Sequence, residues 1–207
     1  MITTTFLAAS LLMMYSCNDG EKSTSNETTT TNMSTDSGKG MMSDQSTTTD
    51  ANNNAATAAA TDNNMMMTFA NEAASGGMME VEMAKLARQN ASSAEVKAFA
   101  KMIENDHAKA NTELKSIAAS KNMALPADLM SIHQQHMDEM MNMKGKDFDK
   151  HYIDMMVEDH NDDINSFKNA SANLTDEQLK AFATKTLPVL QKHLDKAKSL
   201  KEKMDKM

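Results

Sequence analysis

The strongest constraint on the fold is an apolar pattern that recurs in steps of three and four residues through the C-terminal two thirds of the chain. In the segment 92–120 it comprises Val96, Phe99, Ala100, Ile103, Ala110, Leu114 and Ile117. This spacing places apolar side chains on one face of an α-helix. Aromatic residues make up only 4% of the chain, and strands favour aromatic and β-branched residues. The sequence therefore predicts an all-α domain.

The same periodicity predicts four long helices and one shorter helix, over residues 65–90, 92–120, 126–143, 147–170 and 175–206. The first is expected to be interrupted or kinked at Gly76-Gly77, and the last should kink at Pro188. Capping boxes mark two helix starts, Ser92 with Glu95 and Thr175 with Gln178. Pro126 is expected to open the short helix, because proline is favoured in a first helical turn.

Short links join the first two long helices and the last two, so each pair is expected to form an antiparallel hairpin. The short helix, about 25 Å long at 1.5 Å per residue, can run back along the bundle between the hairpins. Hairpin, crossover and hairpin is the connection of a ferritin-like four-helix bundle. An up-and-down bundle with the short helix as an appendage is the alternative. This domain is assigned to residues 65–207.

The N-terminus resembles a bacterial lipoprotein signal. An apolar run, Phe6 to Tyr15, precedes Cys17, the single cysteine of the chain. Residues 1–16 are therefore predicted to be a signal peptide, with Cys17 lipidated and the membrane as a partner through that anchor. The box before the cysteine, Met14-Tyr15-Ser16, is a loose match, and the basic region usual in signals is absent. A plain cleaved signal peptide is the alternative.

Residues 17–64 consist mainly of Thr, Ser, Asn, Asp, Gly and Ala. Such a composition buries too little apolar surface to offset the entropy of ordering, so this segment is predicted to be a disordered tether. The formal net charge of the chain is -8. Nucleic acid is not an expected partner, because its recognition requires a basic face. The pattern identifies no protein partner.

Three histidines fall on the predicted inward faces of three different helices. His107, His160 and His193 each lie near the middle of a long helix, so they can meet at one level of the bundle. Glu80, on a small-residue face of the first helix, and Glu104, in a Glu-x-x-His unit with His107, are candidate carboxylate ligands. Imidazole with carboxylate suits zinc, iron or manganese. Purely structural hydrogen bonding by these histidines is the alternative.

A dinuclear carboxylate site of the ferritin type is disfavoured. Such sites use a second Glu-x-x-His unit, whereas Val157 and Leu190 stand three residues before the other two histidines. A weaker candidate site lies on the short helix, where imidazole and thioether groups share one face and could bind copper(I): His133, His136, Met137 and Met140. Core packing is the alternative there, because the chain uses 23 methionines throughout.

Several stretches in order resemble the bacterial "domain of unknown function 4142" family over about Phe69 to Leu200. They are F-A-N-E-A-A-S-G-G-M-M-E-V-E-M-A-K-L-A, S-S-A-E-V-K-A-F-A-K-M-I-E-N-D-H, K-D-F-D-K-H-Y and A-F-A-T-K-T-L-P-V-L-Q-K-H-L. The resemblance implies a ferritin-like helical fold and an outer-membrane or envelope location. Positions that match the family pattern are Asp106-His107, His160, Thr186-Leu187-Pro188 and His193. It implies no activity.

The expected protein is thus a lipid-anchored protein of the bacterial cell envelope, in the periplasm or at the outer membrane, with a ferritin-like bundle that binds a metal ion. The rival hypothesis is a structural or partner-binding envelope protein whose histidines only stabilise the bundle. A redox enzyme is a weaker third hypothesis, because no complete carboxylate set is visible. The chain has no Gly-rich phosphate loop and no nucleophile elbow of the G-x-S-x-G type.

Overall fold

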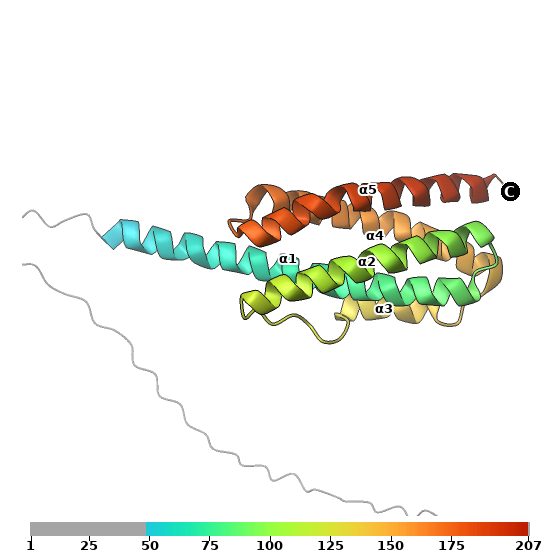
Figure 1. Cartoon of the computed structure of the whole chain (residues 1–207), viewed down its shortest axis with the longest axis horizontal. Helices are drawn as coiled ribbons and strands as arrows, with labels where there is room; N and C mark the ends of the chain where they lie inside the picture. Colours follow the sequence, from blue (N-terminus) through green and yellow to red (C-terminus); the bar gives the residue numbers. More distant parts are fainter. Residues whose placement is uncertain (1–48, 207) are drawn as a thin grey trace, which may run out of the picture. The chain divides into compact units, whose positions relative to one another are not determined.

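The computed structural model describes residues 49–206, which form five helices: α1 Thr49–Asn90, α2 Ala94–Ser120, α3 Ser131–Met140, α4 Gly145–Asn173 and α5 Glu177–Asp205 (Figure 1). Within this part of the chain β-structure is limited to one isolated bridge, between Ala91 and Gly145. The all-α prediction is therefore confirmed. No helix among the described residues is both long and apolar enough to cross a membrane. The predicted signal, Cys17 and residues 18–48 of the tether lie outside the described residues.

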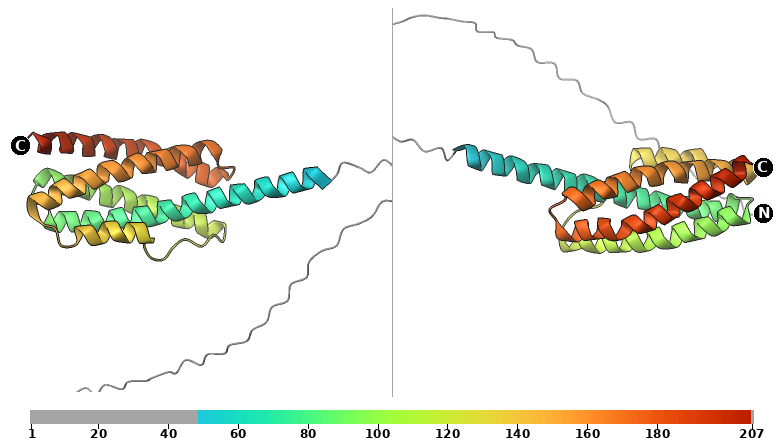
Figure 2. Two further views of the ribbon diagram at one scale, coloured as in Figure 1. Left: turned by 180° about the vertical axis from the view of Figure 1, so that it is seen from behind. Right: turned by 90° about the horizontal axis from the view of Figure 1, so that it is seen from above.

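The helices follow the predicted ferritin-like connection. Helices α1 and α2 form one antiparallel hairpin, and α4 and α5 form the other (Figures 1 and 2). The chain between the hairpins runs back along the bundle, with α3 packed against α1 and α4. As a result α2 and α4 run in the same direction, which an up-and-down bundle would not produce (Figure 1).

Helix α1 differs from its prediction in two respects. It begins at Thr49 rather than at Met65, and it continues through Gly76 and Gly77 without interruption. The run of alanines over residues 55–60 explains the early start, because alanine has the highest helix propensity and extending an existing helix is cheap. Residues 49–64, predicted to belong to the disordered tether, are thus part of this helix. Asp62 in this extension accepts a hydrogen bond from the N–H of Thr175, 3.3 Å away.

The predicted N-caps are each wrong by one residue. Helix α2 is capped by Ser93, whose hydroxyl accepts a hydrogen bond from the N–H of Val96 at 3.3 Å. Helix α5 is capped by Asp176, whose carboxylate accepts the N–H of Leu179 at 2.9 Å. In both cases the residue predicted as the cap, Ser92 or Thr175, instead bonds to a residue far away in the chain, Asp149 or Asp62. The sequence around each cap does not reveal this contact.

The short helix α3 begins at Ser131, so the prediction that Pro126 opens it is wrong. The preceding loop is held against α1 by a hydrogen bond from the N–H of Met130 to the hydroxyl of the buried Ser75, at 2.8 Å. That bond holds Met130 in an extended conformation, so the helix begins only at Ser131. Helix α5 continues through Pro188, which cannot donate a backbone hydrogen bond to the preceding turn.

The core consists of two apolar clusters. One surrounds Phe99, Ile103, Phe148, Tyr152 and Met156. The other contains Phe69, Leu114, Phe167, Phe182 and Leu190. On α2 and α4 one histidine, His107 or His160, lies between the residues of the two clusters, and on α5 His193 lies beside Leu194, near the end of the second cluster. The bundle therefore contains a polar layer between two apolar ones.

One buried carboxylate links the second hairpin to the first through hydrogen bonds. Asp149 on α4 accepts hydrogen bonds from the N–H groups of Ser92 and Ser93, at 3.0 and 2.9 Å, and from the Ser92 hydroxyl. It therefore satisfies backbone donors at the start of α2 from another helix.

We expect Asp149→Ala to lower the free energy of unfolding by about 2–4 kcal/mol, because it leaves these donors without a charged acceptor. Urea denaturation of the full chain measures this loss. Asp147→Ala is the matched control, since Asp147 lies two residues before Asp149 in α4 and is exposed. Equal losses in the two variants would contradict the assigned role of Asp149.

Candidate metal centre

Four buried polar side chains, one from each long helix, meet in the layer between the apolar clusters. His107 is 7% exposed, Glu80 1%, and both His160 and His193 are 0% exposed. Each occupies a position at which the apolar stripe of its helix faces the bundle axis. The prediction from periodicity that the three histidines meet at one level agrees with this geometry.

The three imidazoles are close enough to share one ion. One ring nitrogen from each of His107, His160 and His193 lies within 4.8 Å of the corresponding atoms of the other two. Nε2 of His160 is 3.2 Å from Nδ1 of His193. The ring centroids are 5.3 to 5.5 Å apart. An ion at the centre of this triangle would have three nitrogen ligands from three helices.

Carboxylates contact the other nitrogen of each ring. Glu80 has Oε2 2.6 Å from Nδ1 of His107 and Oε1 3.3 Å from Nδ1 of His160. Asp106 has Oδ2 3.2 Å from Nε2 of His193. Such contacts favour the tautomers in which the remaining nitrogens carry lone pairs. Those nitrogens are Nε2 of His107, which is buried without a hydrogen-bond partner, Nε2 of His160 and Nδ1 of His193.

The two glutamates predicted as ligands have different surroundings. Glu80 contacts Nδ1 of both His107 and His160, so it orients these two rings and is not placed as a further ligand. Glu104 does not join the layer, because its carboxylate forms an ion pair with Arg88 at 2.6 Å. The Glu-x-x-His spacing places Glu104 beside His107 on the helix surface, but an arginine from α1 captures it there. Asp106, next to His107 in the chain, instead contacts His193.

Burial disfavours charge on every group of the layer. It raises the pKa of Glu80 from 4.5 to about 8. It lowers the pKa of His107, and lowers that of His160 well below the usual value, with repulsion from the neighbouring histidines as a further cause for His160. Burial and the proximity of His107 lower the pKa of His193 to about 4. Neutral imidazole is the form that binds metals, so the three ligands are ready near neutral pH without losing a proton.

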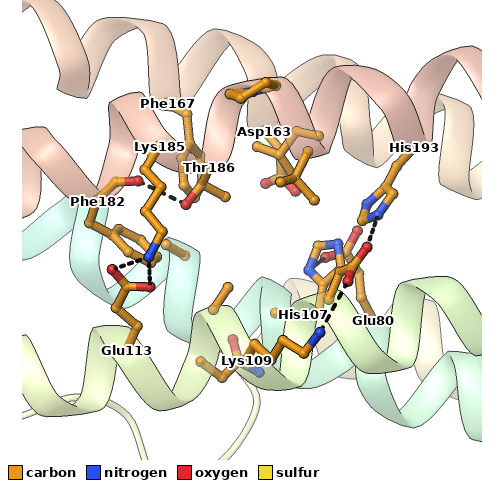
Figure 3. Close-up of a pocket in the computed structure, with 18 of the residues that line it drawn as sticks. Glu80, His107, Lys109, Glu113, Asp163, Phe167, Phe182, Lys185, Thr186 and His193 are labelled. Carbon is orange, nitrogen blue, oxygen red and sulfur yellow. Dashed lines mark hydrogen bonds and ion pairs between the residues drawn. The ribbon is translucent and has the colours of Figure 1, made fainter.

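A cavity of about 480 Å³ adjoins this layer (Figure 3). His107 and His193 line one end of it, whereas His160 is not among its lining residues. Lys185 and Glu113 stand at the other end, joined at 2.8 and 3.0 Å. Asp163 lies in the wall between these ends, and its pKa is raised to about 8 by burial and by the nearby Glu80. The histidine triangle therefore borders the cavity on one side.

The second predicted group of ligands does not converge. Nδ1 of His133 is 2.6 Å from the hydroxyl of Ser75, and Nδ1 of His136 is 3.7 Å from Oδ1 of Asp159. Met140 is fully buried in the core, and Met137 packs against the same core cluster. These contacts favour the packing interpretation, and copper(I) binding on this helix stays a prediction.

The sequence interpretation missed Asp163. Asp163 follows His160 by three residues, a spacing that places both on neighbouring positions of one helix face. That spacing could have indicated it. The pairing of Asp106 with His193 joins two helices, and no spacing within either helix indicates it.

The family described as Domain of unknown function (DUF4142) matches residues 47–200 of the chain. No curated protein matches the sequence. Among solved structures, a DUF305 protein from Streptomyces coelicolor, whose description calls it secreted, is similar with a TM-score of 0.58 and 16% identity. The match covers 66% of this chain and 90% of that one. At this identity the likeness concerns the helical fold alone.

Proposed function

Because the chain belongs to the DUF4142 family, whose description states no function, we propose from its own residues that the bundle binds one divalent transition-metal ion through His107, His160 and His193. The observation that carries this proposal is the orientation of the three rings. Each has one nitrogen against a carboxylate and the other without one, and these other nitrogens belong to rings packed at 5.3 to 5.5 Å. Carboxylates that orient metal-bound histidines are usual beyond the ligands themselves.

Three neutral nitrogen ligands favour zinc or iron over manganese, which prefers oxygen ligands. A site with three protein ligands keeps a further position open for water or another small molecule, in contrast to closed structural sites with four. In this chain the open side would be that of His107 and His193, since these two histidines line the cavity. The site therefore suits reversible binding of the ion, or binding of a small molecule to it.

A structural role for the histidines is the second candidate, and one observation favours it. His193 bonds both to His160 and to Asp106, at 3.2 Å in each case, so part of the polar layer is satisfied by protein groups alone. The orphaned Nε2 of His107 is not explained by this role, because buried nitrogen atoms usually have a partner.

The location proposed for this site is the bacterial cell envelope, with the bundle tethered through a lipid on Cys17. The sequence of apolar run, single cysteine and polar segment supports this proposal. The description of the similar Streptomyces coelicolor protein as secreted is compatible with it. A metal-binding bundle in the periplasm or at the outer membrane would hold or buffer an ion taken up by the cell.

Metal analysis of the full chain tests the proposed site. After loading with zinc or iron and removal of free ion, one ion per chain is expected, and cobalt(II) in its place should give an absorption spectrum of nitrogen ligation. A ligand that binds only the folded state adds about 2.7 kcal/mol at a hundredfold excess over Kd, so the melting temperature should rise and a chelator should reverse the rise. A chain that takes up none of these metals and has the same melting temperature in their presence would reject the metal site. The structural role of the histidines would then remain.

The anchor has its own test. Cys17→Ala is expected to move the protein from the membrane fraction to the soluble fraction of the producing bacterium, because each buried methylene of a lipid chain contributes about 0.8 kcal/mol to membrane binding. Immunoblots of the two fractions measure it, with Ser16→Ala as the neighbouring control. Retention of the Cys17 variant in the membrane fraction would reject the lipid anchor at this residue.

A further inference from the structure

We propose that the cavity beside His107 and His193 binds a small organic monoanion with an apolar body, whose head group completes the coordination of the metal ion. This inference rests on the proposed metal site and names the class of molecule that its open side receives. Three features of the cavity carry it: the walls, the charge of the layer and the charge of the rim.

The walls are mostly apolar and belong to all four long helices. They include Ala73 on α1, Ala110 on α2, Phe167 on α4, and Phe182 and Leu190 on α5. The two phenylalanines pack against each other with ring centroids 5.9 Å apart, which makes a rigid aromatic surface. A cavity of about 480 Å³ lies within the usual range of small-molecule sites. Walls of this kind bind an apolar body and offer little to a sugar or a phosphate ester.

The charges around the triangle favour one negative charge on the head group. The three imidazoles bring no charge when neutral, and the charge of Asp106 is opposed by Lys109, 3.9 Å away. A divalent ion held by these ligands brings positive charge into a buried layer, where uncompensated charge is costly. A monoanion bound to the ion would reduce that charge. Asp163, which has no hydrogen bond or ion pair with any of the described residues, faces the same cavity and can bond a second polar atom of the ligand.

The rim of the cavity carries three exposed lysines, Lys109, Lys185 and Lys192. Lys109 lies 3.9 Å from Asp106, and Lys185 pairs with Glu113 at the far end (Figure 3). Lys192 has no ion pair among the described residues, so its charge is available to an entering anion. Clustered charges of one sign raise the local concentration and the association rate of ligands of opposite sign. The cavity thus has a basic entrance, an apolar middle and a metal-binding end.

The test uses the full chain loaded with cobalt(II) and two probes of equal charge, benzoate and acetate. Both have the same head group, and benzoate alone has an apolar body that can lie against Phe167 and Phe182. Spectral titration should show that both anions change the cobalt absorption. Benzoate is expected to bind at least tenfold more tightly than acetate.

Two variants separate the cavity from the ion. Ala110→Leu places additional volume in the wall and should remove the preference for benzoate while one cobalt ion per chain is retained. Lys185→Gln should weaken both anions about equally, by severalfold, and this effect should vanish in high salt. Glu202→Gln, at an exposed position near the end of α5, is the control and should bind as the unchanged chain does.

The outcomes for the two proposals are distinguishable. Absence of cobalt binding before any anion is added would defeat the metal site itself. Cobalt binding with a spectrum that neither anion changes, or with equal affinity for both anions, would overturn the proposed ligand class and leave the metal site intact. Retained benzoate preference in a folded, cobalt-loaded Ala110→Leu variant would show that the apolar body lies outside this cavity.

Discussion

Metal binding is expected to be lost when His160 is replaced by alanine. His160 is fully buried at the centre of the layer, with Nε2 3.2 Å from His193 and Nδ1 3.3 Å from Glu80. Its removal takes away one of three proposed ligands and leaves two, and no other imidazole is near enough among the described residues to replace it. A metal that adds about 4.1 kcal/mol to the unchanged chain at a thousandfold excess over Kd should add nothing measurable to this variant.

The variant also separates the metal hypothesis from the structural one. A structural histidine would cost about 1–3 kcal/mol on removal, through a cavity and unpaired polar neighbours, whether or not metal is present. Calorimetric melts of both chains, with and without zinc, measure the two effects apart. His151→Ala is the control, because His151 is partly exposed and lies 3.6 Å from Glu139, outside the layer. A His160→Ala chain that still binds zinc with unchanged affinity would exclude this histidine as a ligand.

The positions of the three histidines could be predicted from the sequence because helical periodicity decides which face of a helix a residue occupies. Each of the three stands in an apolar stripe, and the level at which they meet follows from their central positions. The orientation of each ring could not be predicted in this way. It depends on carboxylates that other helices supply, such as Glu80 from α1 for His107 and His160.

The errors in the sequence interpretation have the same origin. Glu104 has a favourable spacing from His107, but Arg88 on the neighbouring helix pairs with it. Ser92 has a favourable capping sequence, but Asp149, 57 residues further along the chain, bonds to it and leaves Ser93 as the cap. Local patterns predict elements and faces, whereas contacts between distant helices decide which of two neighbouring polar residues fills a role.

The stability of the metal-free chain is expected to fall as the pH rises from about 6.5 to about 8. The pKa of Glu80 is raised from 4.5 to about 8 on folding, so between these values the folded chain binds a proton that the unfolded chain has released. Stability falls with pH wherever the folded state binds more protons. Asp159 and Asp163, with pKa values also raised to about 8 by burial, act in the same direction.

The histidines act in the opposite direction at lower pH. Their pKa values are lowered by burial, so the unfolded chain binds more protons below about 6.5, and stability rises with pH in that range. The two effects oppose each other between about pH 4.5 and 6.5. Above about pH 6.5 only the effect of the carboxyl groups remains. For Glu80 alone the full effect is on the order of 5 kcal/mol, at about 1.4 kcal/mol for each tenfold change in proton affinity.

Glu80→Gln tests this assignment, because glutamine keeps the shape of the side chain and has no proton to lose. Urea denaturation between pH 6 and 9 should show a smaller fall in stability for this variant than for the unchanged chain, while the exposed control Glu82→Gln should retain the full fall. The same variant should bind metal about 10- to 100-fold more weakly, because a neutral amide orients the two histidines less well than a carboxylate. A Glu80→Gln chain with the original pH dependence and the original metal affinity would remove Glu80 from both roles. A changed pH dependence with unchanged metal affinity would instead show that Glu80 is a buried titrating acid that does not orient the metal ligands.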